Sequence, residues 1–125
     1  MVRLRPPAPE PDAFLPLPAS EFQILLALAD GERHGYAIMQ EVDRRSGGAM
    51  RLGPGTLYGS VKRMLAAGLI EESEQRPAAT RDDERRRYYR ITALGRHVAT
   101  AEARRMERLV TAARAKRLLG RPEPA

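Results

Sequence analysis

The sequence predicts a mainly α-helical fold with one small β-hairpin, in the order helix, helix, helix, hairpin, helix. Three observations lead to this prediction. Apolar residues recur at three- and four-residue steps in four stretches, and glycine or proline stands at the ends of several of them. Two short β-prone stretches flank a polar loop before the last helical stretch. This order is typical of a winged helix-turn-helix domain followed by a long C-terminal helix.

The first helix is predicted to begin at Ser20, because Ser20 and Gln23 have the spacing of a capping box. Gly31 suits its left-handed end. The second helix is predicted over residues 35–45, and the glycines after Ser46 break it. Its inward face carries Tyr36, Met39 and Val42.

The third helix is predicted from Pro54 or Gly55 to about Ala67, since proline suits a first turn and Gly68 a C-terminal stop. Its buried stripe is Leu57, Val61, Met64 and Leu65. Residues 70–74 and 87–91 form the two strands of the predicted hairpin. The charged loop 75–86 between them is the predicted wing.

The last helix is predicted to begin after Thr92, its N-cap, and to end near Leu119, a span of roughly 40 Å. Such a length exceeds what the core of so small a domain needs. The helix has a thin, broken apolar stripe, and a long helix of this kind usually pairs with another helix. The stripe is therefore the predicted homodimer surface, and it consists of Leu94, Val98, Met106, Leu109, Val110 and Ala113.

These elements divide the chain into four parts. Residues 1–18 are predicted to be a flexible proline-rich arm, although Phe14, Leu15 and Leu17 are apolar enough to dock. Residues 19–91 form the winged helix-turn-helix domain, residues 92–119 the dimerisation helix, and residues 120–125 a disordered tail.

Composition narrows the class of protein. The 125 residues carry a net charge of +6, which suits a polyanionic partner, although arginine supplies most of the basic residues and a GC-rich coding sequence would also favour it. The chain has no cysteine, no apolar run near the roughly 18 residues of a membrane span, and no signal peptide. A cytoplasmic protein with no membrane contact is expected.

The third helix is the predicted recognition helix, because the major groove of DNA admits one α-helix. No acidic residue occurs between Arg51 and Ile70, and Gly55 and Gly59 allow a close backbone approach. Wing arginines are expected to contact phosphates or a narrow minor groove. The predicted DNA-binding residues are Gly55, Thr56, Tyr58, Gly59, Ser60, Lys62 and Arg63 on the helix and Arg81, Arg85, Arg86 and Arg87 in the wing.

Other classes of function fit less well. An enzyme would need a nucleophile–base set or a metal cluster, whereas the chain offers only the isolated His34 and His97. We therefore expect no catalytic residues, no metal and no cofactor. A winged helix that binds only protein would carry an apolar or acidic patch on the third helix. An RNA-binding one would display stacking aromatics there, and only Tyr58 qualifies. Both stay as alternatives.

Several motifs resemble those of PadR-like transcriptional regulators, over roughly residues 20–115. The sequence Leu-Gly-Pro-Gly-Thr-Leu-Tyr at 52–58, followed by Arg-Met-Leu at 63–65 and Gly-Leu-Ile at 68–70, resembles that family's recognition-helix signature. Gly-Tyr-Ala-Ile at 35–38 resembles the start of its second helix. The segment 86–92 with Gly95 resembles its second wing strand and the start of its last helix. By length the chain resembles the short subgroup of the family.

This resemblance implies a cytoplasmic, dimeric regulator, usually a repressor, that binds promoter DNA. It also implies dimerisation through the last helix and frequent relief of repression by an effector. Regulators that hold planar drugs between aromatic rings need such rings at the dimer centre, but the chain has no tryptophan and only two phenylalanines and four tyrosines. An aromatic drug sandwich is therefore not supported, and a smaller apolar effector, or no effector at all, fits the sequence equally well.

Overall fold

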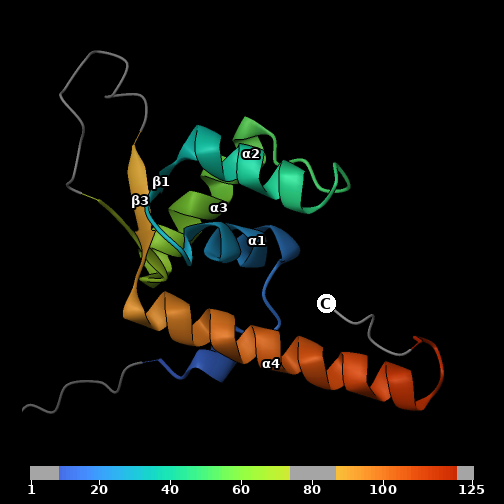
Figure 1. Ribbon diagram of the computed structural model, residues 1–125. Helices are drawn as coiled ribbons and strands as arrows, with labels where there is room; N and C mark the ends of the chain where they lie inside the picture. The colour runs from blue at the N-terminus through green and yellow to red at the C-terminus, as the bar shows by residue number, and fades with distance from the viewer. Residues whose placement is uncertain (1–8, 74–86, 121–125) are drawn as a thin grey trace, which may run out of the picture.

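The computed structural model describes residues 9–73 and 87–120, which form a bundle of helices with a small sheet (Figure 1). Helices α1 (Ala19–Leu28), α2 (Gly35–Arg45) and α3 (Pro54–Ala67) lie on one side of the long helix α4 (Ala93–Ala115). This confirms the predicted fold class. No helix in the described part of the chain is long and apolar enough to cross a membrane.

The sheet has three antiparallel strands in the order β1-β3-β2. Strands β2 (Ile70–Glu72) and β3 (Tyr88–Ile91) are the predicted hairpin, with Ile70 opposite Ile91. The sequence did not predict β1 (Arg33–His34), which pairs with the other edge of β3. Two residues are too few to show the alternation by which a strand is predicted.

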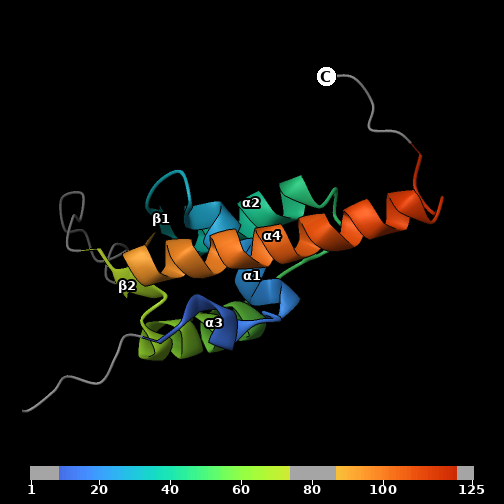
Figure 2. The same cartoon turned by 90° about the horizontal axis from the view of Figure 1, so that it is seen from below.

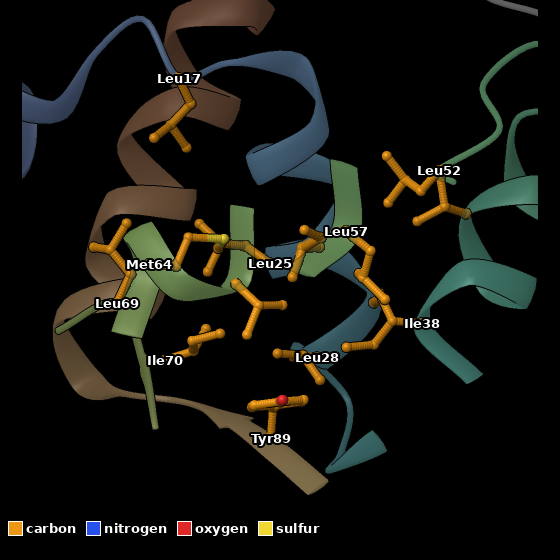
Figure 3. Packing of buried hydrophobic residues seen from close by; sticks show 14 of the residues in the cluster. Leu17, Leu25, Leu28, Ile38, Leu52, Leu57, Met64, Leu69, Ile70 and Tyr89 are labelled. Carbon is orange, nitrogen blue, oxygen red and sulfur yellow. The ribbon is translucent and has the colours of Figure 1, made fainter. Parts of the chain in front are cut away.

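One apolar core joins the three short helices, the sheet and the start of α4 (Figure 3). Leu25 and Leu28 of α1 pack with Met64 of α3 and with Ile70 and Tyr89 of the hairpin, all at most 4% exposed. This core fixes the position of α3 relative to strands β2 and β3 of the hairpin.

The predicted helix boundaries hold except at both ends of α1 and at the end of α4. Helix α1 ends at Leu28 with a right-handed C-cap at Ala29, and Gly31, with a φ of 156°, does not form the predicted left-handed end. Helix α1 begins one residue early, with Pro18 at its N-cap, and Ser20 makes no cap. The Ser20 hydroxyl lies instead 3.2 Å from the Ser60 hydroxyl of α3, so the capping box is wrong. Helix α4 ends at Ala115, before Arg117 adopts a left-handed φ of 64°.

Residues 9–18 differ from the expected flexible arm. They include a short 3-10 helix, η1 (Pro11–Phe14), which contacts α4 (Figure 1). Leu17 is 8% exposed, and Phe14 and Leu15 are partly buried against the same core. The apolar side chains of this segment therefore dock, despite its prolines, and we call residues 9–18 the strap.

Helix α4 is anchored to the rest of the fold by its first turn. The Thr92 hydroxyl donates to the carbonyl of Gly68 at 2.6 Å and accepts from the backbone N–H of Gly95 at 3.0 Å. A Cβ on Gly95 would lie 1.9 Å from the carbonyl oxygen of Leu69, so only glycine fits there. The second half of α4 extends beyond the other helices (Figures 1 and 2).

Candidate nucleic-acid interface

Helix α3 has one buried and one open face along its whole length. Leu57, Val61 and Met64 are at most 2% exposed and face the core. Thr56 and Lys62 are exposed on the opposite side. Pro54 in the first turn and Gly68, with a φ of 79° at the C-cap, bound the helix as predicted. The open face thus presents the polar groups that the sequence placed there, with one exception.

The exception is Ser60, which is completely buried and faces α1 rather than solvent. Its hydroxyl lies 3.2 Å from that of Ser20 and accepts a hydrogen bond of 3.2 Å from Nη2 of Arg63. Its position three residues after Leu57 places it on the inward face, where the Ser20 hydroxyl satisfies it. Ser60 therefore cannot contact DNA directly, and the prediction for this residue is wrong.

Arg63 lies on the rim of the open face and is tied to α1. Its Nε is 3.6 Å from Oε2 of Glu21, and its side chain is 63% exposed. The Glu21 side chain is only 11% exposed. A partly buried carboxylate thus holds the guanidinium beside α1, and a phosphate would have to compete with it.

The two glycines of the open face are not required by the packing of the chain itself. A Cβ on Gly55 would meet no atom within 4 Å, and a Cβ on Gly59 would meet only Nη1 of Arg63, at 3.6 Å. Inside a helix, glycine costs up to about 1 kcal/mol relative to alanine. Their presence is therefore consistent with an external surface that approaches the helix closely.

Tyr58 stands at the edge of α3 and is 46% exposed. A Cβ on Gly35 would lie 2.9 Å from the Tyr58 hydroxyl and 3.2 Å from Cδ2 of Leu57. Gly35 therefore allows α2 and α3 to approach closely. The ring of Tyr58 packs partly against the start of α2 and keeps one side open to solvent.

The base of the wing carries paired charges. Nη1 of Arg87 is 3.1 Å from Oε1 of Glu72, and Nε of Arg90 is 2.7 Å from Oε1 of Glu71. Arg87 remains 61% exposed. The other predicted wing contacts, Arg81, Arg85 and Arg86, lie outside the described residues.

The predicted dimer stripe on α4 divides into two parts. Val98 is completely buried and cannot meet a partner as predicted, and Leu94 is partly buried against the core of the same chain. Leu109 is 57% and Val110 37% exposed. Met106 and Ala113 are half-buried.

Glu102 is a buried charge that the sequence did not reveal. Its side chain is fully buried; Oε2 accepts a hydrogen bond of 2.6 Å from the backbone N–H of Leu17, and Oε1 accepts one from Nε of Arg105. Burial alone would raise the pKa of Glu102, but the hydrogen bonds from Arg105 and Leu17 outweigh it and hold the pKa below its ordinary value. The sequence shows only Glu and Arg three residues apart, which is typical of a surface pair.

Tyr36 is also placed differently from its prediction. It was expected on the inward face of α2, but it is 57% exposed. His34 precedes it as the N-cap of the helix, where Nδ1 accepts from the backbone N–H of Ala37 at 3.1 Å. The three-residue spacing with Met39 and Val42 misled the prediction, because the buried face of α2 is formed by Gly35, Ile38 and Val42 and Tyr36 lies one position away from it.

A model of the transcriptional regulator PadR-like family matches residues 24–101. The chain belongs to this family. Transcriptional regulator Rv3488 of Mycobacterium tuberculosis (strain ATCC 25618 / H37Rv) is 41% identical over 91 residues, which make up 73% of this chain and 78% of that protein. An uncharacterised 37.1 kDa protein in transposon TN4556 of Streptomyces fradiae is 39% identical over 90 residues, 72% of this chain. The chain spans only 24% of that protein.

Solved structures share the fold. A PadR family transcription regulator from hypervirulent Clostridium difficile R20291 superposes with a TM-score of 0.65 at 21% identity, over 82% of this chain and 100% of that one. A transcriptional regulator from Clostridium thermocellum gives a TM-score of 0.63 at 24% identity, over 77% and 87% of the two chains. The resemblance seen in the motifs is thus confirmed: the chain is a DNA-binding transcription regulator and not an enzyme.

Proposed function

We propose that this PadR-like regulator is a cytoplasmic homodimeric repressor that binds a promoter operator through α3 and the wing. The open face of α3 carries the proposal, since its exposed charged side chains, Lys62 and Arg63, are both basic and no acidic residue lies on the helix. Thr56, Tyr58 and Lys62 contact the DNA directly, and Arg63 joins them when a phosphate replaces Glu21. Arginines of the wing add flanking contacts to the backbone.

The second half of α4 is the proposed dimer surface. Leu109 and Val110 are exposed there on a helix that extends past the rest of the chain (Figure 2). Pairing of two such helices buries the stripe formed by Met106, Leu109, Val110 and Ala113. It also sets the separation of the two α3 helices to match major grooves about 34 Å apart on one side of DNA.

In this proposal the bound dimer blocks transcription by occupying the promoter. Repression is relieved when the distance between the two α3 helices changes. A small apolar effector that binds between paired α4 helices would shift the two recognition helices relative to each other. In this arrangement residues 19–91 read DNA, while the second half of α4 joins the subunits.

The test is a fluorescence-anisotropy titration of labelled promoter duplex against a scrambled duplex, at several salt concentrations. We expect one dimer per site, with preference for the promoter that survives moderate salt.

Lys62→Ala should weaken binding to both duplexes and lower the salt slope by about one unit. Leu109→Glu should produce monomers in sedimentation velocity and abolish tight binding. Equal, salt-sensitive binding to both duplexes by the wild type would contradict operator recognition by this protein.

A further inference from the structure

Four aromatic side chains, His34, Tyr36, Tyr58 and Tyr88, surround the start of α2, and we call them the aromatic cluster. The His34 ring stacks on that of Tyr36, with centroids 6.4 Å apart and an interplanar angle of 13°. It meets the Tyr88 ring edge-on at 5.5 Å. The Tyr58 hydroxyl lies against Gly35, which directly precedes Tyr36. The cluster therefore joins β1, α2, α3 and β3.

The sheet places this cluster at the base of the wing. His34 pairs with Tyr88, the first residue of β3, at the end of the sheet where the chain returns from the segment 74–86. Helix α2 thus begins beside the first residue of β3, and Tyr58 links the same point to α3 (Figure 1). The aromatic cluster lies between the two elements that are proposed to enter adjacent grooves of DNA.

Exposure separates two members of the cluster from the others. Tyr36 is 57% and Tyr58 46% exposed, whereas His34 and Tyr88 are half-buried. In the described part of the chain, the other large exposed apolar side chains are Leu109, Val110, Leu118 and Leu119, on α4 and just beyond it. The large apolar surface that the DNA-binding domain exposes within the described residues is thus confined to these two tyrosines.

The proposed docking of α3 and the wing determines which part of the DNA lies over the aromatic cluster. When α3 occupies the major groove and the wing reaches the flanking minor groove, the sugar–phosphate strand between these grooves passes over the surface that separates the two elements. A tyrosine suits that strand, because its ring packs against deoxyribose and its hydroxyl donates to a phosphate oxygen. These contacts carry no information about base sequence.

We propose that Tyr36 is a DNA-backbone contact and that His34 positions its ring. The proposal rests on the proposed docking of α3 and the wing, and it adds a residue that the recognition helix does not supply. His34 is held in place by the backbone N–H of Ala37, which donates to its Nδ1, and by the Tyr88 ring, which lies nearly perpendicular to it. Stacking on His34 restrains the Tyr36 ring, so less rotamer freedom is lost when DNA binds.

The test compares Tyr36→Ala and Tyr36→Phe with the wild type in anisotropy titrations on promoter and scrambled duplexes over a salt series. We expect Tyr36→Ala to lose about tenfold in affinity for both duplexes, which corresponds to about 1.4 kcal/mol. Tyr36→Phe should lose a smaller part, because it keeps the ring. The salt slope should stay at the wild-type value in both variants, since no ionic contact is removed, whereas Lys62→Ala lowers it.

Leu118→Ala is the matched control, because it removes an apolar side chain of 78% exposure at the far end of the molecule. It should bind both duplexes like the wild type. Circular dichroism melts of each variant identify any affinity loss that comes from unfolding. Wild-type binding together with Tyr36→Ala affinity within twofold of it, in a folded variant, would overturn this proposal alone. Failure of the wild type to prefer its promoter would instead overturn the proposed function.

Discussion

Helices α3 and α4 differ in which part of each helix is buried in the core and which part is left exposed. Helix α3 is divided lengthwise, because buried residues recur from Leu57 to Met64 while the opposite face stays open. Helix α4 is divided crosswise. Its buried residues are Gly95, Val98 and Glu102, and none is buried after Glu102.

Under the proposed function, this difference reflects two kinds of partner, DNA for α3 and a second copy of the chain for α4. A helix that enters a groove must be held from behind along its whole length, so that one face is rigid and the other free. A helix that joins two subunits needs an anchor at one end and an open stretch at the other. Helix α3 accordingly has buried residues from Leu57 to Met64, whereas the second half of α4 projects beyond the other helices (Figure 2).

Gly95→Ala tests the anchor of α4 and should have the largest effect. The added Cβ would lie 1.9 Å from the Leu69 carbonyl oxygen, and backbone cannot move aside as a flexible side chain does. We expect a loss of about 3 kcal/mol or more in the free energy of unfolding, measured by urea denaturation. An alanine variant as stable as the wild type would show that α4 is not anchored through this turn.

Val98→Ala and Leu109→Ala compare the two halves of α4 directly. Val98 is completely buried, so its truncation should cost about 2 kcal/mol of stability through lost burial and a cavity. Leu109 is 57% exposed, so its truncation should change the stability of the isolated chain by less than about 0.5 kcal/mol. Urea denaturation at low protein concentration measures both, and sedimentation should show weaker self-association only for Leu109→Ala. Equal stability losses would contradict the crosswise division.

Glu102→Gln tests the contact that joins the strap to α4. Hydrogen bonds to charged groups are worth about 1.5–3 kcal/mol, so near neutral pH the variant should be less stable by about 1.5 kcal/mol. The folded pKa of Glu102 lies below its ordinary value of 4.5 because the hydrogen bonds from Arg105 and Leu17 outweigh burial. Its contribution to stability is therefore present above pH 4.5 and is lost as the pH falls through the folded pKa.

The measurement is thermal unfolding from pH 7 to pH 3. The difference in stability between wild type and Glu102→Gln should shrink as the pH falls below about 4.5. Glu107→Gln, in the exposed half of α4, removes an equal charge and corrects for net charge. A difference that stays constant over this range would show that the Glu102 carboxylate does not hold the strap.

The lengthwise division of α3 could be predicted from the sequence because its cause is local. Leu57, Val61 and Met64 recur at helical spacing, and Pro54 and Gly68 bound the helix. The error at Ser60 arose because its partner, Ser20, lies 40 residues away and polarity alone suggested solvent. A small hydroxyl on the inward face is stable there only because that partner satisfies it.

The crosswise division of α4 could not be predicted, because its apolar pattern runs through both halves. What covers the first half comes from distant parts of the chain. Leu17 reaches Glu102 across 85 residues, and Gly95 lies against the turn after α3. Periodicity shows which side of a helix is apolar, but not where along the helix the covering surface ends.

Gly59→Ala is the counterpart of Gly95→Ala on the open face of α3, and it should raise stability slightly instead of lowering it. Its Cβ would meet only the end of the Arg63 side chain, at an ordinary contact of 3.6 Å. Because alanine favours the helix, the variant should be more stable by up to about 1 kcal/mol in urea denaturation. Its affinity for promoter DNA should nevertheless fall several-fold in anisotropy titrations, since the methyl group occupies space that the DNA would fill. If the variant is both more stable and equally tight in binding, DNA does not contact α3 at Gly59, and the open face must meet its partner farther toward Thr56.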